Sequence, residues 1–328
     1  MESITILSTV KNIRPTVIPW LTSIISQEFD GSYEIVIIDS ESTDGTKEIL
    51  ERFEKKYKCI KVIEFESTQP EALNFAIEND LITGELVSLI DGDCVAPKNW
   101  LSILYKTLKE NNVDAVGGPG LTPDNINFMQ KIIGLDTNMR FLSIPEGLVK
   151  RHPNMNLLIK RHVLESLKFD KDLNMGYDAD FCHRLNLNGY KLWYSHQAFV
   201  WHYHRSSLKS YFRQQFFNAK YYFKFGKKLN TAFKGDNINP LGMILQPILL
   251  VIILVSSLLI FVNPIFEKIL IISCLILLAL FSFGVIASFK LSRDIKSFLL
   301  YFIYLFRLLA WTSGALTTVI KQIIFKAE

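Results

Sequence analysis

Two aspartates flank a glycine at Asp91-Gly92-Asp93, immediately after the apolar run of residues 86–90. Carboxylate oxygens are the ligands that hard divalent cations prefer, and the small residue between them leaves room for a diphosphate group to approach. A cation held there would neutralise the charge of a departing nucleotide diphosphate. Aspartate and glycine are also common in simple turns, but the position at the end of an apolar strand favours the metal site.

Two further polar clusters follow apolar runs. The first contains Thr9, Val10 and Asn12, and the second begins at Asp39 and includes Asp44. Asp39 comes directly after a strand-like run and is predicted to contact a ligand, whereas Asp44 suits a turn and helix cap. In open α/β sheets, ligands lie beyond the carboxyl ends of the strands. We therefore expect all three clusters to converge on one crevice.

The elements that must position these clusters alternate between strand and helix. Apolar periodicity predicts strands over residues 3–8, 34–38, 60–64 and 86–90, separated by helices over residues 15–27, 46–56 and 71–79. Such alternation builds a mostly parallel α/β sheet with helices on both faces. Further along, a helix is predicted over residues 176–188, and the stretch 117–153 is expected to be flexible.

The carboxyl-terminal part of the chain has a different composition. The chain is 49% hydrophobic over its 328 residues, and the excess lies in three apolar segments, residues 241–262, 269–289 and 298–320. Each segment is long enough for a helix to cross the bilayer core. The third contains Arg307, so it fits a span, an interfacial helix or a helix whose arginine pairs with a partner. Buried helices of a soluble core are the alternative, but they would leave continuous apolar faces exposed.

Basic residues around the apolar segments predict the orientation of the chain. They mark the link after the second segment and the approach to the first, at Lys290, Arg293 and Lys296 and at Lys220, Lys224, Lys227, Lys228 and Lys234. By the positive-inside rule, both regions face the cytoplasm. The amino terminus lacks a secretory signal, and the cysteines, without CxxC spacing, fit a reducing compartment. We therefore predict a multi-pass protein of the cell membrane with a cytoplasmic catalytic domain.

Four motifs occur in order along residues 3–205. They are Ile-Leu-Ser-Thr-Val-Lys-Asn in the first strand, Asp-Ser-Glu-Ser-Thr-Asp-Gly-Thr from Asp39, the helix Glu-Ala-Leu-Asn-Phe-Ala-Ile with Thr83-Gly84-Glu85 before Asp91-Gly92-Asp93, and Asn154 through Lys160-Arg161 to Gly176-Tyr-Asp-Ala-Asp-Phe. In these motifs the chain resembles the family 2 glycosyltransferases. The resemblance implies a GT-A fold, a Mg²⁺ or Mn²⁺ ion, a nucleotide-diphosphate sugar donor and inversion at the anomeric carbon.

The resemblance also implies roles for individual residues. Asp39 would accept a hydrogen bond from the nucleotide base, Asp91 would contact the ribose or the metal, and Asp93 would coordinate the ion directly. The matching motif positions extend the predicted nucleotide-sugar site to Thr9, Val10, Asn12, Asn74 and Gly92.

Asp178 aligns with the aspartate of the acidic pair that ends in the family's catalytic base. Tyr177 occupies the usual glutamate position, and Asp180 is a local competitor for the role. An inverting displacement needs a base because the acceptor hydroxyl must lose its proton as the new bond forms. Apart from the resemblance, Asp178 fits an ordinary carboxylate in the first turn of a helix.

His202 and His204 lie at period two in Val-Trp-His-Tyr-His-Arg, and therefore on one side of an extended segment. Either could supply a third metal ligand, as a histidine does in some similar transferases, and His202 fits the family pattern better. A structural role for the pair is the alternative.

Residues 206–228 then mix aromatic and basic side chains at helical spacing, which suits a membrane interface or a domain-packing helix. Within them, Arg213 and Gln214 are hypothesised to contact an acceptor phosphate.

The predicted organisation is a GT-A glycosyltransferase domain over residues 1–205, amphipathic interfacial helices over 206–235 and a transmembrane region of about three spans over 241–320. We predict an inverting, metal-dependent hexosyltransferase that moves a sugar to a lipid-linked polyprenyl or dolichyl acceptor in glycan or glycoprotein assembly. Two alternatives stay open: a polyprenyl-phosphate sugar synthase, whose acceptor is the lipid phosphate, and a catalytically degenerate membrane scaffold. Nucleic-acid binding is not expected, since the net charge is only +4 and no zinc-finger or RNA-binding signature is present.

Overall fold

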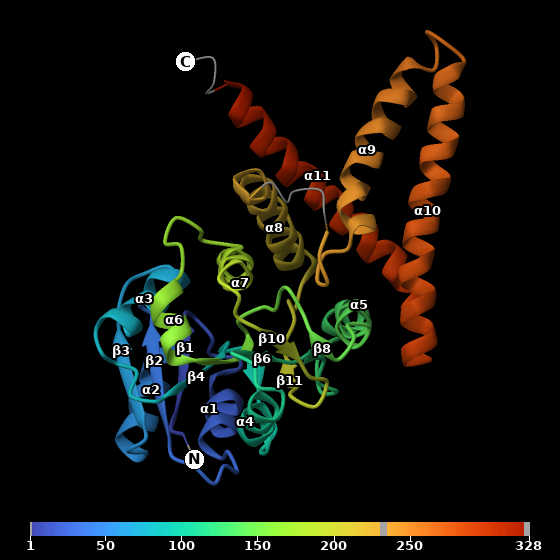
Figure 1. The fold of residues 1–328 in the computed structure, drawn as a ribbon. Helices are drawn as coiled ribbons and strands as arrows, with labels where there is room; N and C mark the ends of the chain where they lie inside the picture. The colour runs from blue at the N-terminus through green and yellow to red at the C-terminus, as the bar shows by residue number, and fades with distance from the viewer. Residues whose placement is uncertain (1, 230–234, 325–328) are drawn as a thin grey trace. The chain divides into compact units, whose positions relative to one another are not determined.

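The structure, a computed structural model, describes residues 2–229 and 235–324. It divides into two compact units, Met1–Pro123 with Phe141–Tyr203 and Asp124–Arg140 with His204–Glu328. Residues 230–234 lie outside the described residues, and with them Lys234 and part of the predicted interfacial region 206–235. Figure 1 shows strands and helices interleaved in the first unit and long helices in the second.

Among the described residues, the first unit holds an eight-stranded sheet in the order β3-β2-β1-β4-β9-β6-β10-β8. The strands are β1 (Ile4–Val10), β2 (Tyr33–Asp39), β3 (Ile60–Glu64), β4 (Leu86–Ile90), β6 (Ala115–Gly117), β8 (Gly147–Leu148), β9 (Asn156–Lys160) and β10 (Leu192–Tyr194). β1 to β4 run parallel to one another, whereas β9 is antiparallel to both β4 and β6. The predicted α/β sheet is therefore confirmed, with its parallel part in the first half of the domain.

Helices alternate with these strands. They are α1 (Val17–Ile25), α2 (Thr46–Lys56), α3 (Gln69–Glu78), α4 (Trp100–Glu110), α6 (Arg161–Leu167) and α7 (Tyr177–Leu187). The predicted helices match α1, α2, α3 and α7 to within two residues at each end, whereas α4 and α6 were not predicted. The predictions for α2, β3 and β4 are confirmed with the same bounds. The continuous apolar run of β2 also behaves as predicted. Its residues Ile35 to Ile38 are buried, as expected for a parallel strand that is covered on both faces.

A second, smaller sheet brings distant segments together beside β4. It consists of β5 (Cys94–Val95), β11 (Val200–His202) and β7 (Gly120–Leu121), in the order β5-β11-β7. β5 and β11 are antiparallel, and His202 pairs with Cys94 in their register. β11 therefore returns the chain to the residues that follow Asp91-Gly92-Asp93.

Asn74 ties α3 to the loop before α7. Its side chain is 1% exposed, its Nδ2 donates to the Phe169 carbonyl at 2.8 Å, and its Oδ1 accepts from the Phe169 N–H at 2.8 Å. Both partners are backbone groups in the core, where an unpaired polar group is costly. In this structure Asn74 thus holds two segments of the domain together.

We expect Asn74→Ala to lower the free energy of unfolding by about 2–4 kcal/mol, because the Phe169 N–H and carbonyl lose their partners together. The matched control is Asn79→Ala at the carboxyl-terminal cap of the same helix, since the exposed Asn79 side chain donates to the Phe75 carbonyl of its own helix. Chemical denaturation of the two variants checks this prediction. If both variants lost the same small amount of stability, the structural role assigned to Asn74 would be contradicted.

The second unit is helical within the residues described. It contains α5 (Phe128–Leu142), α8 (Leu208–Leu229), α9 (Leu241–Leu259), α10 (Ile265–Ser292), the short 3-10 helix η1 (Ile295–Leu299) and α11 (Leu300–Ile324).

The expectation of a flexible stretch over residues 117–153 is wrong, because this stretch contains β7, α5 and β8. Ile132 and Ile133 of α5 pack in one apolar cluster with Tyr211, Leu300 and Ile303, and this packing orders the helix.

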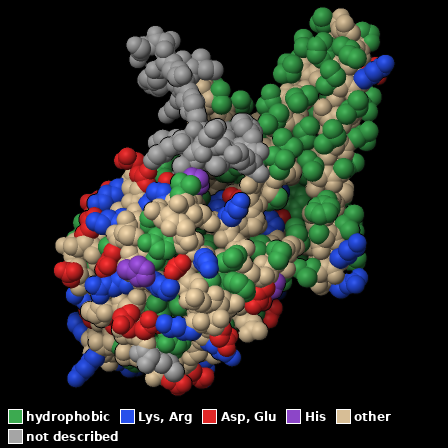
Figure 2. Space-filling model, viewed as in Figure 1, with side chains coloured by type: hydrophobic (Ala, Val, Ile, Leu, Met, Phe, Trp, Pro, Cys, Tyr) green, Lys and Arg blue, Asp and Glu red, His purple; other side chains and the backbone are tan. Residues whose placement is uncertain are grey.

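Three helical segments among the described residues are long and apolar enough to cross a membrane: Leu241–Leu259, Ile265–Ser292 and Ile295–Ile320. α9 and α10 form an antiparallel hairpin (Figure 1), and Figure 2 shows hydrophobic side chains over most of its visible surface. The predicted apolar segments are therefore confirmed as helices, and they mark the chain as a membrane protein. Arg307 in the third segment is buried and donates to Asp136 Oδ2 of α5 at 3.1 Å.

Candidate active site

β4 delivers Asp91-Gly92-Asp93 to the end of the parallel sheet next to the end of β1. Gly92 is buried against the loop after β1, where an added Cβ would lie 2.6 Å from Ile13 Cδ1 and 2.9 Å from Val10 Cγ1. The Thr16 hydroxyl also donates to the Gly92 carbonyl at 2.8 Å. Close packing therefore requires a glycine between the two aspartates, and this packing fixes the direction in which the chain leaves the strand.

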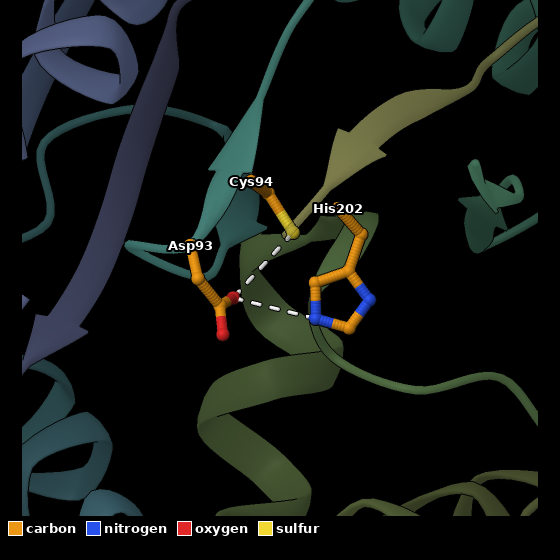
Figure 3. A group of neighbouring side chains, drawn as sticks. All are labelled: Asp93, Cys94 and His202. Atoms are coloured by element: carbon orange, nitrogen blue, oxygen red, sulfur yellow. Dashed lines mark hydrogen bonds and ion pairs between the residues drawn. The ribbon is translucent and has the colours of Figure 1, made fainter. Parts of the chain in front are cut away.

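Asp93, Cys94 and His202 form a candidate metal site (Figure 3), because one ligand atom from each lies within 4.8 Å of the others. His202 Nε2 is 3.5 Å from Asp93 Oδ1, and the Tyr203 N–H donates to the Asp93 carbonyl at 2.9 Å. The antiparallel pairing of β11 with β5 thus places His202 over Asp93. His204, the other candidate, belongs to the second unit, where its carbonyl accepts from Gln130.

Cys94 is a weak ligand in this group although its sulfur lies close by. Burial, the Asp93 carboxylate and the Asp91 carboxylate raise the pKa of the Cys94 thiol well above its usual value. Without a bound cation the thiol therefore keeps its proton, and a metal, which binds the thiolate, would have to displace that proton first. Asp93 and His202 are the better ligands. A carboxylate suits both Mn²⁺ and Mg²⁺, and an imidazole beside it favours the transition metal Mn²⁺ of the two.

Asp91 lies beside this pair in an acidic environment. Burial, Asp93 and Asp178 together raise the pKa of Asp91 to about 7, while His202 and a hydrogen bond from Gln69 Nε2 at 3.2 Å act in the opposite direction. A buried carboxylate whose pKa is raised by neighbouring carboxylates is stabilised in its charged form by a cation placed among them. The residues present therefore fit a hard divalent ion.

Gln69 reaches Asp91 because it is the first residue of α3. Thr68 caps that helix: its N–H and its hydroxyl both donate to Glu71 Oε2, at 2.8 and 2.7 Å. This capping box fixes where the helix starts and so fixes the position of Gln69. The sequence reasoning overlooked Gln69, although the Thr-x-x-Glu spacing of the capping box was readable.

Asp178 faces the same acidic group from the first turn of α7. Gly176 precedes the helix with a left-handed φ of 79°, which starts the turn. Asp178 Oδ2 is 3.9 Å from an Arg151 guanidinium nitrogen, and both side chains are mostly buried. Burial, together with the Asp91 and Asp178 carboxylates, raises the pKa of the neighbouring Tyr177 well above its usual value, so this residue stays neutral.

Asp180 has a different environment from Asp178. Two positions along a helix turn the side chain by about 200°, to the other face. Asp180 is buried and its Oδ2 accepts from Arg184 Nε at 2.6 Å, while the same guanidinium donates to the Leu167 and Lys168 carbonyls. The carboxylate of Asp180 is thus part of a structural pair, and Asp178 is the one that lies near Asp91.

The loops after β1 and β2 meet, as expected from the strand order. Asp39 is buried, and its two oxygens accept from the Ser42 hydroxyl at 2.5 Å and the Ser42 N–H at 3.1 Å. Asn12, with a positive φ of 54°, donates its N–H to the Ser42 hydroxyl and accepts from the Thr43 N–H. Asp44 accepts from the N–H of Thr46, the first residue of α2, whereas the N-cap position itself is occupied by Gly45.

The remaining predicted contacts stay predictions. Thr9 is half-buried at the end of β1, Val10 is buried against the same loop, and Asn74 uses its amide on the Phe169 backbone. Arg213 and Gln214 lie on α8 in the second unit. The sequence reasoning also missed Arg151. A basic residue shortly before the motif that begins at Asn154 is too common to be a specific signal.

We expect His202→Ala to weaken Mn²⁺ binding at least tenfold, because it removes a ligand from the Asp93 group. His204→Ala is the matched control and should leave the affinity within about twofold. Titration of the purified full-length protein with Mn²⁺, followed by the electron paramagnetic resonance signal of the free ion, measures both. If only the His204 variant lost affinity for Mn²⁺, the metal ligand would be His204 and not His202.

Two family descriptions match the chain. Residues 5–164 match "Glycosyl transferase family 2", and residues 86–313 match "Glycosyl transferase family group 2". The second match covers more than half of the chain and extends into α11 of the second unit.

The curated relatives that the chain resembles are also glycosyltransferases. The chain is similar to glycosyltransferase AglE of Haloferax volcanii, 30% identical over 189 residues that make up 56% of this chain and 60% of that protein. It is also similar to glycosyltransferase GlyG of Streptococcus pneumoniae, 24% identical over 174 residues, or 52% of this chain and 57% of that protein. The matched region thus spans about three fifths of the length of these relatives.

A solved structure confirms the predicted GT-A fold. The mannosyltransferase PcManGT from Pyrobaculum calidifontis, determined in complex with GDP-Man and Mn²⁺, superposes with a TM-score of 0.59. The alignment covers 96% of this chain and 86% of that chain at 19% identity.

Proposed function

The chain belongs to the family 2 glycosyltransferases, and we propose that it moves one hexose, with inversion, from a nucleotide-diphosphate sugar to a lipid-linked acceptor. The observation that carries the proposal is the group of Asp91, Asp93, His202 and Asp178. Asp93 and His202 approach each other at 3.5 Å, and Asp178 is near enough to Asp91 to raise its pKa. A metal ligand pair and a separate carboxylate are the two parts that an inverting displacement requires.

Asp93 and His202 would hold a Mn²⁺ or Mg²⁺ ion, with Asp91 beside them. When bound, such an ion stabilises the charge of the departing diphosphate. The GDP-Man and Mn²⁺ of the mannosyltransferase neighbour support this donor and cofactor class. Asp39, held by Ser42 at the adjacent strand end, would face the nucleotide base.

Asp178 would take the proton of the acceptor hydroxyl as that oxygen attacks the anomeric carbon. A carboxylate in this role is ordinarily ionised near neutral pH. Arg151, 3.9 Å away, would hold the carboxylate in place. A lipid phosphate acceptor, by contrast, is already anionic and needs no base, so the placement of Asp178 favours a hydroxyl acceptor.

The helices of the second unit support the lipid part of the proposal. α9 and α10 are apolar on their exposed surfaces, which suits a membrane anchor that keeps the enzyme near a lipid-borne acceptor. Lys290 in the last turn of α10, and Arg293 and Lys296 after it, are exposed. By the positive-inside rule this link would face the cytoplasm.

Thermal unfolding of the detergent-purified protein with a panel of nucleotide-diphosphate sugars, with and without Mn²⁺, tests the proposal. A donor present at about 100 times its Kd adds about 2.7 kcal/mol to the free energy of unfolding, so the melting temperature should rise for one donor when Mn²⁺ is present. A cooperative melt with no shift for UDP-, GDP- or other diphosphate sugars would contradict the proposed donor class.

A further inference from the structure

α11 and the preceding η1 expose one apolar stripe. We define the α11 stripe as Phe298, Phe302, Leu305, Leu309, Leu316 and Ile320, whose side chains are 43–51% exposed. The intervals of three, four and seven residues place them on one face of the helix. Ser313 lies on this face as well, but its hydroxyl donates to the Leu309 carbonyl at 2.8 Å, so the stripe has no unsatisfied hydroxyl there.

The opposite face of α11 is buried and polar at its amino-terminal end. The Tyr304 hydroxyl donates to Asp136 Oδ1 at 2.7 Å, and Arg307 donates to Asp136 Oδ2 at 3.1 Å. Arg140, one turn along α5, is paired with the same carboxylate at 3.2 Å. Burial alone would raise the pKa of Asp136, but the two arginines outweigh it and hold this pKa below its ordinary value.

Further along, the same buried face pairs with α8. Trp311 Nε1 donates to Gln215 Oε1 at 2.9 Å, and the Thr318 hydroxyl donates to the Lys220 carbonyl at 3.1 Å. Polar contacts therefore accompany α11 from Tyr304 to Thr318, which is most of its length.

The helices that make these contacts do not suit the interior of a bilayer. α8 exposes Lys209 and Arg213, and Lys220 is partly exposed. Charged side chains at the centre of a bilayer are rare because they lose their hydration. Since α11 is tied to α8 and α5 along its length, it cannot leave the depth at which these helices lie.

α9 and α10 differ from α11 in both burial and direction. Only 28% and 22% of their apolar windows are buried, against 56% for the segment Ile295–Ile320. Figure 1 shows α9 and α10 side by side, whereas α11 runs in another direction within the same unit.

We propose that α9 and α10 are the membrane spans and that η1 and α11 lie in the plane of the membrane interface, with the α11 stripe in the acyl chains of one leaflet. Lys290, Arg293 and Lys296, exposed from the last turn of α10 to the start of η1, would meet anionic headgroups. Because two spans return the chain to the side from which α9 starts, the helix lies on that side.

Depth measurement by nitroxide accessibility tests this arrangement. Single cysteines at Phe302, Leu309 and Ile320, in full-length protein whose accessible Cys59 and Cys274 are replaced by serine, are spin-labelled in proteoliposomes containing phosphatidylglycerol. Relative accessibility to oxygen and to a nickel chelate then gives the depth of each label. For an interfacial helix we expect the three depths to agree within about 5 Å, all at the level of the outer acyl chains.

Ile272, Leu278 and Phe283 on α10 are the matched control, because these exposed side chains cover the same eleven-residue separation as Leu309 to Ile320. A span rises about 1.5 Å per residue, so the control labels should differ in depth by up to about 16 Å. A profile on α11 like that of α10, with a maximum near Leu309, would show that α11 spans and would overturn the proposal. Labels at all three α11 positions that are exposed to the nickel chelate, as in water, would overturn it as well.

Discussion

Asp178→Asn should reduce sugar transfer by about a hundredfold to ten-thousandfold, the usual contribution of a general base. The amide has nearly the shape of the carboxylate but cannot take the proton of the acceptor hydroxyl. Donor binding should be retained, because the candidate metal ligands Asp93 and His202 are unchanged. Initial rates of transfer, together with the donor-induced rise in melting temperature, separate the loss of chemistry from a loss of binding.

Asp180→Asn is the control in the same helical turn. Because Asp180 is buried against Arg184, this variant should lose about 1–2 kcal/mol of stability while its folded fraction keeps transferring sugar. If the folded Asp178→Asn protein transfers at the full rate and the Asp180→Asn protein does not, the base is Asp180.

Asp93→Ala should weaken Mn²⁺ binding by more than about a hundredfold, since even residues that only orient metal ligands contribute tenfold to a hundredfold. The donor-induced rise in melting temperature should then no longer depend on Mn²⁺, and transfer should fall with it. Titration with Mn²⁺ and the thermal shift with donor measure the two effects separately.

Asp30→Ala removes an exposed aspartate from a loop after α1 and serves as the control for lost charge. It should leave metal affinity and transfer unchanged. An Asp93→Ala protein that still shows Mn²⁺-dependent donor binding would place the ion elsewhere, with Asp91 as the next candidate.

Local patterns were sufficient to predict the first half of the catalytic unit. α2 shows alternating apolar and charged residues at helical spacing, and β2 is a continuous apolar run, so each is determined by its own residues. The second half of the sheet could not be predicted in this way. β9 inserts antiparallel between β4 and β6, and such a pairing depends on contacts between segments far apart in the chain.

The same difference applies to the site. The position of Asp91-Gly92-Asp93 after an apolar strand was visible in the sequence, but the choice between His202 and His204 was not. The short pairing of β11 with β5 brings His202 to Asp93, and no local pattern specifies that register. Gln69 and Arg151 likewise reach the aspartates from separate elements.

Arg307 shows the same limit in the helical unit. Its partner Asp136 is 171 residues away, in a stretch that was expected to be flexible. α5 carries apolar residues at Met129, Ile132 and Ile133, one turn apart, so the helix was readable. The buried arginine was noticed in the sequence, but the ion pair that accommodates it becomes visible only when α5 and α11 are seen together.

The most direct test of the proposed function is a transfer reaction with the purified full-length protein, the donor selected by thermal shift, and a polyprenyl-linked acceptor, with either Mn²⁺ or a chelator. Nuclear magnetic resonance of the product reports the anomeric configuration of the new bond. We predict a lipid-linked product of configuration opposite to that of the donor, formed only with the ion. A product that retains the donor configuration, or one formed equally well with the chelator, would contradict the metal-dependent, inverting reaction.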